Sequence, residues 1–326
     1  MRRRIGRARD GRRQAFTFTD LVVCLIMAAL ILAMGVNAVH KARDGGPRTQ
    51  CASVLRQIGT AMVLYANANN GAFPRTRYAP GPTVAFAQYT GASAADPFAP
   101  DGPQPNDVTA SPYLLLRTQG LPAYAFMCPS TTTIEPAPEP LLAASNFAGG
   151  RYLAYGFAVM YPDAAAVRSG YKWDSTLNAD FAIGGDMNSG DPALSTLTPT
   201  SPRDQIERAN SRNHGGQGQN VLFGDGHVEW ADTPFVGVNK DNIYTTVLPP
   251  TGNHFPPQTS ATIVGPPGWR GDTVLLPIAT VDPGSTHRPE KSSWTSPIVI
   301  GASVVLVVAT SVITYVARRR KAAVRD

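Results

Sequence analysis

The sequence predicts an α+β fold in which a long N-terminal helix packs on a small antiparallel β-sheet, followed by a second helix near the C-terminus. Three observations predict this fold. An uncharged apolar run follows Asp20, and apolar residues at helical spacing come after it. Later, two short apolar runs flank Asp225-Gly226, a pattern typical of a β-hairpin. The first two observations predict the long helix, and the third predicts part of the sheet.

The first apolar run is long enough to predict a transmembrane helix over residues 16–39. After Asp20, no charged residue occurs until Lys41. At about 1.5 Å per residue, residues 21–39 would cross the hydrocarbon core of a bilayer. A secretory signal peptide is a poorer match, because no small-x-small cleavage site follows. Asp20 itself is unusual, since an acid inside an apolar helix is costly in lipid and indicates a specific role.

A second apolar run predicts another transmembrane helix over residues 296–317. Residues 298–316 are uncharged and are followed by basic residues in the tail, 318–326. Basic residues favour the cytoplasmic side of a membrane. The expected location is therefore the cell inner membrane, with both termini cytoplasmic and the central domain extracytoplasmic.

The charge distribution argues against nucleic-acid binding. The formal net charge is +6, but residues 16–317 hold 17 basic and 21 acidic side chains. The positive charge is thus confined to the two ends, where it flanks the apolar runs and is better explained by membrane topology than by phosphate contacts.

Helical spacing resumes after the first apolar run. Gly45-Gly46-Pro47 is expected to break or kink the helix, because proline lacks an amide donor and restricts the residue before it. Beyond it, an apolar stripe is predicted to lie on the globular domain. The residues of this stripe are Leu55, Ile58, Met62 and Tyr65. The helix is expected to end at residues 69–71, Asn-Asn-Gly.

The central part of the chain predicts a small α+β domain. Residues 151–159 and 181–186 are expected to be strands, residues 202–213 a helix, and residues 221–230 the hairpin. The chain is divided into a basic leader (1–15), a transmembrane helix (16–39), its extension (40–70), an extracytoplasmic domain (71–248), a Pro/Ser/Thr-rich linker (249–295), a second transmembrane helix (296–317) and a cytoplasmic tail (318–326).

The junction Ala15-Phe16-Thr17-Phe18-Thr19-Asp20-Leu21 resembles the cleavage and methylation signal of type IV prepilins and type II secretion pseudopilins. The resemblance implies a pilin-like fold, cleavage by prepilin peptidase between Ala15 and Phe16, and N-methylation of Phe16. It also implies that Asp20 meets the N-terminal amine of a neighbouring subunit. Two residues depart from the pattern: Ala15 replaces the usual glycine, and Asp20 replaces the usual glutamate.

Other segments resemble a large bacterial family that has a prepilin-type N-terminus and a C-terminal His-x9-Asp-Gly motif. They are residues 50–61, Cys128-Pro129-Ser130, and the motif His214, Asp225, Gly226 and His227. Here ten residues separate His214 from Asp225, one more than in the family pattern. The family has no settled activity.

Candidate sites have competing interpretations. His214, Asp225 and His227 could bind zinc, but a structural role in the hairpin is favoured, so no metal or other cofactor is expected. Residues 186–191 resemble the opening of a calcium loop, although a polar surface turn explains them better. Cys51 and Cys128 would face an oxidising compartment, where two thiols tend to pair, but the sequence leaves open whether they meet.

These patterns favour a structural protein over an enzyme. The hypothesis is a pseudopilin-like, membrane-anchored assembly protein of the bacterial envelope. Its expected partners are prepilin peptidase, membrane lipid, and copies of itself or other pseudopilins. Two alternatives remain: a non-assembling surface module with two anchors, and a metal-dependent hydrolase.

Overall fold

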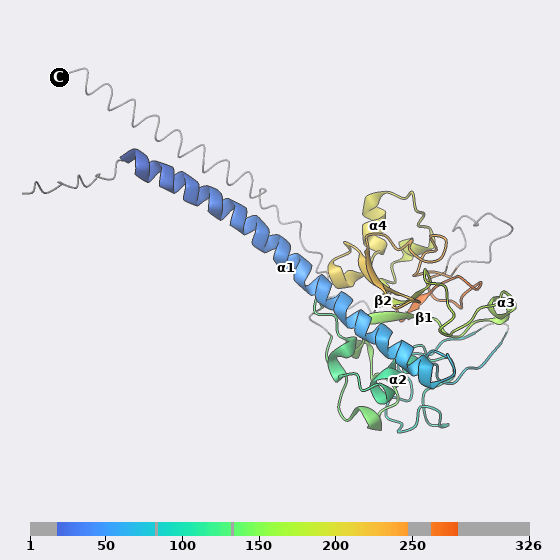
Figure 1. Cartoon of the computed structure of the whole chain (residues 1–326). Helices are drawn as coiled ribbons and strands as arrows, with labels where there is room; N and C mark the ends of the chain where they lie inside the picture. The colour runs from blue at the N-terminus through green and yellow to red at the C-terminus, as the bar shows by residue number, and fades with distance from the viewer. Residues whose placement is uncertain (1–17, 82–83, 132–133, 247–261, 280–326) are drawn as a thin grey trace, which may run out of the picture. The chain divides into compact units, whose positions relative to one another are not determined.

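The computed structural model describes residues 18–81, 84–131, 134–246 and 262–279 (Figure 1). The chain divides into two compact units. One, called the globular unit below, comprises residues 45–288, and the other comprises residues 1–44 with residues 289–326. Ala15, Phe16, the predicted second transmembrane helix and the tail lie outside the described residues.

The first helix, α1, is continuous from Phe18 to Ala68. Within residues 22–31, large apolar side chains such as Leu25 and Ile31 are exposed. In the described part of the chain, no helix is long and apolar enough to cross a membrane, so the predicted transmembrane first half is wrong.

The predicted break at Gly45-Gly46-Pro47 is also wrong, because α1 continues through Pro47. A proline inside a helix costs about 3 kcal/mol. The turns that follow bury Cys51, Leu55 and Ile58 completely. This packing outweighs the local preference of the Gly-Pro pair.

Five short strands form one antiparallel sheet in the order β4-β3-β2-β1-β5. The strands are β1 (Tyr155–Ala158), β2 (Ala182–Asp186), β3 (Gln219–Phe223), β4 (Val228–Ala231) and β5 (Leu275–Leu276). Strand β5 lies inside the predicted linker and pairs with β1 through Phe157–Leu276. An apolar pair within this Pro-rich segment therefore extends the sheet.

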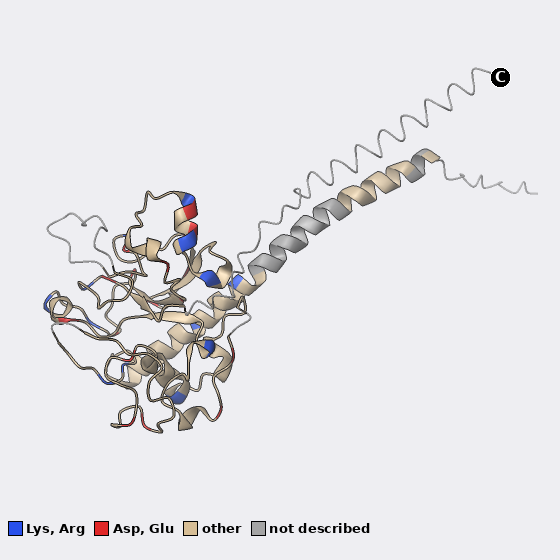
Figure 2. Cartoon of the chain, turned by 180° about the vertical axis from the view of Figure 1, so that it is seen from behind, with Lys and Arg blue, Asp and Glu red and all other residues tan. Residues whose placement is uncertain are grey.

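Short helices and 3-10 turns precede β1 or connect the strands. They are α2 (Ala110–Thr118), α3 (Ala164–Arg168), α4 (Arg203–Ala209) and five 3-10 turns, η1 (Ala123–Phe126), η2 (Leu141–Ala143), η3 (Gly150–Tyr152), η4 (Pro192–Ser195) and η5 (Arg212–His214). On α4, basic and acidic side chains pair at i,i+4, as Arg203–Glu207 and Arg208–Asp204 (Figure 2). Charges of both signs thus share this helix.

The second half of α1 forms part of the core. Leu55, Ile58 and Met62 of the predicted stripe are buried, and Tyr65 is half-buried. Gly59 lies so close to the sheet that an added Cβ would come within 2.7 Å of Leu222 Cδ1. The helix therefore runs directly beside the strands, as Figure 1 shows.

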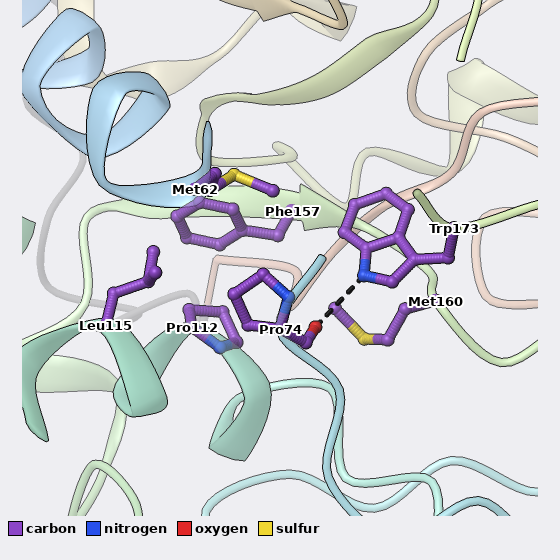
Figure 3. Close-up of a pocket in the computed structure, with 7 residues that line it drawn as sticks. All are labelled: Met62, Pro74, Pro112, Leu115, Phe157, Met160 and Trp173. Carbon is purple, nitrogen blue, oxygen red and sulfur yellow. Dashed lines mark hydrogen bonds between the residues drawn. The ribbon is translucent and has the colours of Figure 1, made fainter. Parts of the chain in front are cut away.

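One cavity in this core is lined entirely by apolar side chains and prolines. Met62 of α1, Leu115 of α2 and Phe157 of β1 meet there, with Trp173 donating its indole N–H to the Pro74 carbonyl at 3.0 Å (Figure 3). The cavity brings no titratable side chain together, so we assign it to packing rather than to function.

The predicted hairpin is formed by β3 and β4, with Asn220 opposite Trp230. In the turn, Gly226 has a positive φ of +88°, whereas Asp225 does not have a positive φ. The Gly226 N–H donates to the Phe223 carbonyl at 2.9 Å. This is a three-residue loop with glycine in the left-handed position.

Candidate functional site

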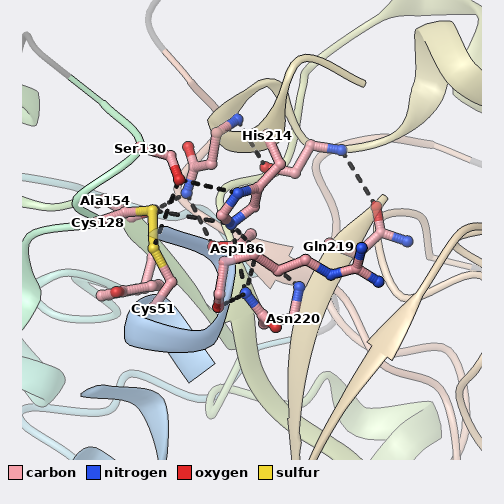
Figure 4. Close-up of polar contacts among 12 residues, drawn as sticks. Cys51, Cys128, Ser130, Ala154, Asp186, His214, Gln219 and Asn220 are labelled. Carbon is pink, nitrogen blue, oxygen red and sulfur yellow. Dashed lines mark hydrogen bonds and ion pairs between the residues drawn. A yellow bond between two sulfur atoms is a disulfide. The ribbon is translucent and has the colours of Figure 1, made fainter. Parts of the chain in front are cut away.

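A buried polar cluster lies where α1, β2, β3 and η5 meet, and Asp186 is at its centre (Figure 4). Asp186 ends β2 and is fully buried. Its Oδ2 accepts from the backbone N–H of Asn220 at 2.6 Å and lies 3.1 Å from His214 Nε2. Its Oδ1 accepts from Asn213 Nδ2 at 3.1 Å. The carboxylate is thus surrounded by donors, the arrangement that a buried charge requires.

His214 connects this carboxylate to the loop that contains Ser130. The 3-10 turn η5 ends at His214, and Gly215 follows with a left-handed φ of 65°. His214 Nε2 faces Asp186, and its Nδ1 lies 3.0 Å from Ser130 Oγ. Only 7% of the His214 side chain is exposed. The ring is therefore fixed at both nitrogens.

Ser130, His214 and Asp186 form a hydroxyl–imidazole–carboxylate chain, but its order differs from that of serine hydrolases. In those enzymes the serine contacts Nε2 and the aspartate contacts Nδ1. Here the two nitrogens are exchanged.

Cys51 of α1 and Cys128 form a disulfide beside His214 (Figure 4). Their Cα atoms are 5.3 Å apart, and 77 residues separate them in sequence. Both residues are buried, and Cys128 Sγ lies 3.8 Å from His214 Nε2. The bond thus links the long helix to the loop that follows η1.

A second contact holds α1 next to the hairpin. The guanidinium of Arg48 lies 3.3 Å from the ring centroid of Trp230. Asn220 Nδ2 also donates to the Arg48 carbonyl at 3.3 Å. Both contacts lie one turn before Cys51, so the disulfide and the cation–π pair anchor the same part of α1.

The structure separates the residues of the His-x-Asp-Gly motif. His214 belongs to the buried cluster, whereas Asp225 and His227 lie at the exposed tip of the hairpin. The His227 backbone and ring N–H groups donate to Asp225 and lower the pKa of its carboxyl. Asp20 lies within α1, but its side chain is not described. The predicted site residues therefore do not form one site.

The expected surface turn at residues 186–191 is wrong, because Asp186, Asn188 and Ser189 are fully buried. The calcium alternative does not fit either. Asn188 donates its amide to the carbonyls of Tyr244 and Leu275, and the Asp191 side chain accepts from the Ala193 N–H. These side chains form hydrogen bonds within the protein and are not directed toward a common ion.

Sequence reasoning missed Asp186, Asn213, Asn220 and the role of Ser130. One signal was present: Asn220 directly precedes the apolar run of β3, and a polar residue inside a buried strand needs a partner. The partner could not be identified without knowing that β2 pairs with β3.

Asp241 is a second buried acidic residue, and its burial predicts that the stability of the fold depends on pH. Asp241 accepts from the Thr273 N–H at 2.9 Å and is almost fully buried. Burial and the neighbouring Asp272 raise its pKa well above the ordinary value. Folded protein therefore holds a proton that unfolded protein loses above about pH 4.

Stability should consequently fall as the pH rises from 4 to 7, and Asp241→Asn should remove this loss because an amide oxygen can still accept from Thr273. Urea unfolding should show that the variant gains stability over wild type as the pH rises from 4 to 7. Asp225→Asn is the control at an exposed carboxyl. An Asp241→Asn protein that retains the wild-type pH dependence would contradict this assignment.

Comparison with known proteins gave no match: no family model, no curated protein and no solved structure is similar to the chain. The class that can be stated is an α+β protein whose long first helix is joined to the rest of the fold by a disulfide, which lies beside a buried Asp–His pair.

Proposed function

We propose that the protein is a pseudopilin-like structural subunit of the bacterial envelope, which assembles with copies of itself or with related subunits. The observation that carries this proposal is the difference in burial between the two halves of α1. Its second half is buried in the globular unit, whereas Leu25 and Ile31 in its first half are 58% and 65% exposed. A run of exposed large apolar side chains marks an interaction surface.

A second copy of the same helix is the occupant that we propose for this surface. Asp20 is the only charged residue between Phe16 and Val39. Cleavage after Ala15 by prepilin peptidase would leave a positively charged amine on Phe16. That amine complements Asp20 of a neighbouring copy, so the two charges would neutralise each other within an apolar bundle.

The disulfide supports an extracytoplasmic location for the globular unit. Disulfides persist in oxidising compartments and are rare in the bacterial cytoplasm. Cys51 and Cys128 are joined and buried, while Cys24 on the first half of α1 is free and exposed.

Cys24 provides the test, because it lies on the proposed surface. A bismaleimide cross-linker applied to the full chain in its host should give covalent dimers through Cys24, and Cys24→Ser should give none. Combining Leu25→Glu with Ile31→Glu should abolish the dimers, since charges on this surface would oppose association.

Val63→Glu is the matched control, because Val63 is also exposed on α1 but lies within the globular unit. It should leave cross-linking unchanged. Absence of dimers in the unmodified chain, or dimers that survive the paired glutamates, would overturn the proposal.

A further inference from the structure

The two cysteines of the disulfide and two side chains beside them together present the ligand set of a structural zinc site. Cys51, Cys128, Asp186 and His214 each offer one ligand atom, and these atoms all lie within 4.8 Å of one another (Figure 4). Two sulfurs, one imidazole nitrogen and one carboxylate oxygen are all zinc ligands in proteins. They come from four separate segments of the chain, so the fold itself assembles them.

The distances already approach those of a tetrahedral site. With metal–ligand bonds of about 2.0–2.3 Å, tetrahedral ligand atoms lie about 3.3–3.8 Å apart. His214 Nε2 is 3.1 Å from Asp186 Oδ2 and 3.8 Å from Cys128 Sγ. The two sulfurs must separate before an ion can bind both of them, because they are bonded to each other. The disulfide and a bound ion therefore exclude one another.

The groups behind these ligands are also suited to a metal site. If zinc takes Nε2 of His214, the ring proton moves to Nδ1, which lies 3.0 Å from Ser130 Oγ and can donate to it. Asp186 Oδ1 is oriented by Asn213 Nδ2 at 3.1 Å. Such partners fix the orientation of ligands and commonly change metal affinity 10–100-fold.

The charge of the cluster is the same in both states. With the disulfide formed, the cluster carries the single negative charge of the Asp186 carboxylate. With zinc bound, two thiolates and one carboxylate offset the two positive charges of the ion and again leave one negative charge. Since Cys51, Cys128 and Asp186 are buried, this equality avoids any added cost of burying charge.

We propose that Cys51, Cys128, Asp186 and His214 form a redox-controlled zinc site. A small dithiol donates two electrons and two protons to the Cys51–Cys128 disulfide, giving two thiols and the oxidised, cyclic disulfide of the reductant. Zn²⁺ then binds both sulfurs, His214 Nε2 and Asp186 Oδ2, and the two thiol protons leave to solvent. A disulfide oxidant reverses the sequence and releases Zn²⁺.

The test measures zinc bound by the full chain before and after reduction, using Cys24→Ser protein so that no other thiol contributes. After dialysis, the reduced protein should hold one Zn²⁺ per chain, and the oxidised protein should hold none. Co²⁺ added in place of zinc should give thiolate charge-transfer and intense tetrahedral visible bands only in the reduced protein.

Two variants separate this site from binding by the thiols alone. His214→Ala should weaken zinc binding at least 10-fold, and Ser130→Ala, which keeps all four ligands, should weaken it about 10-fold. His227→Ala changes an exposed histidine and should have no effect. If His214→Ala does not fold, Ser130→Ala and the oxidised protein still decide the question. Reduced protein without zinc, or folded variants with unchanged affinity, would overturn the proposal.

Discussion

Replacing Asp186 with alanine should destabilise the protein by about 3–5 kcal/mol, because three buried donors lose their acceptor at about 1–3 kcal/mol each. The substitution leaves the Asn220 N–H, the Asn213 amide and His214 Nε2 without their shared acceptor. Each buried donor that loses its acceptor adds a desolvation cost. Urea unfolding followed by circular dichroism gives the difference directly.

Asp225→Asn is the matched control, because Asp225 is about half exposed at the hairpin tip. Its effect should stay within about 0.5 kcal/mol, as for other surface positions. If Asp186→Ala proved as mild as this control, the cluster would not be the link that holds β2, β3 and η5 together.

Removing the disulfide should have an effect of similar size. In the chain-entropy description, cross-linking residues 77 positions apart stabilises a protein by about 4–5 kcal/mol. Cys51→Ser, Cys128→Ser and the double variant should lose similar amounts, because each removes the same bond. We expect lower unfolding midpoints for all three in metal-free buffer.

Cys24→Ser controls for the serine substitution and should leave the midpoint unchanged, since Cys24 is exposed and outside the bond. A Cys51→Ser protein as stable as wild type would show that packing of Leu55, Ile58 and Met62 alone holds α1 in place.

The parts of the fold that could be predicted are those set by local pattern. The spacing of Leu55, Ile58 and Met62 predicted the buried face of α1, and Asp225-Gly226 predicted the β3–β4 hairpin. Local pattern failed at Pro47, where tertiary packing preserves the helix, and in the first half of α1, where no membrane-spanning stretch occurs within the described residues.

The candidate site was less predictable, because its members meet only through long-range pairing. Ser130 and His214 are 84 residues apart, and Asp186 and Asn213 are 27 apart. Asp186 is brought to Asn220 by the pairing of β2 with β3. Its polar sequence context is typical of a surface turn, and the packing of β3 and η5 around its side chain explains its burial.

The most direct test of the proposed function is the intact mass and N-terminal residue of the protein extracted from its own host. We expect a mature chain that begins at N-methylated Phe16, because the amine of this residue is required opposite Asp20. A chain that retains residues 1–15, in cells with an active prepilin peptidase, would contradict the proposal of a pseudopilin-like subunit.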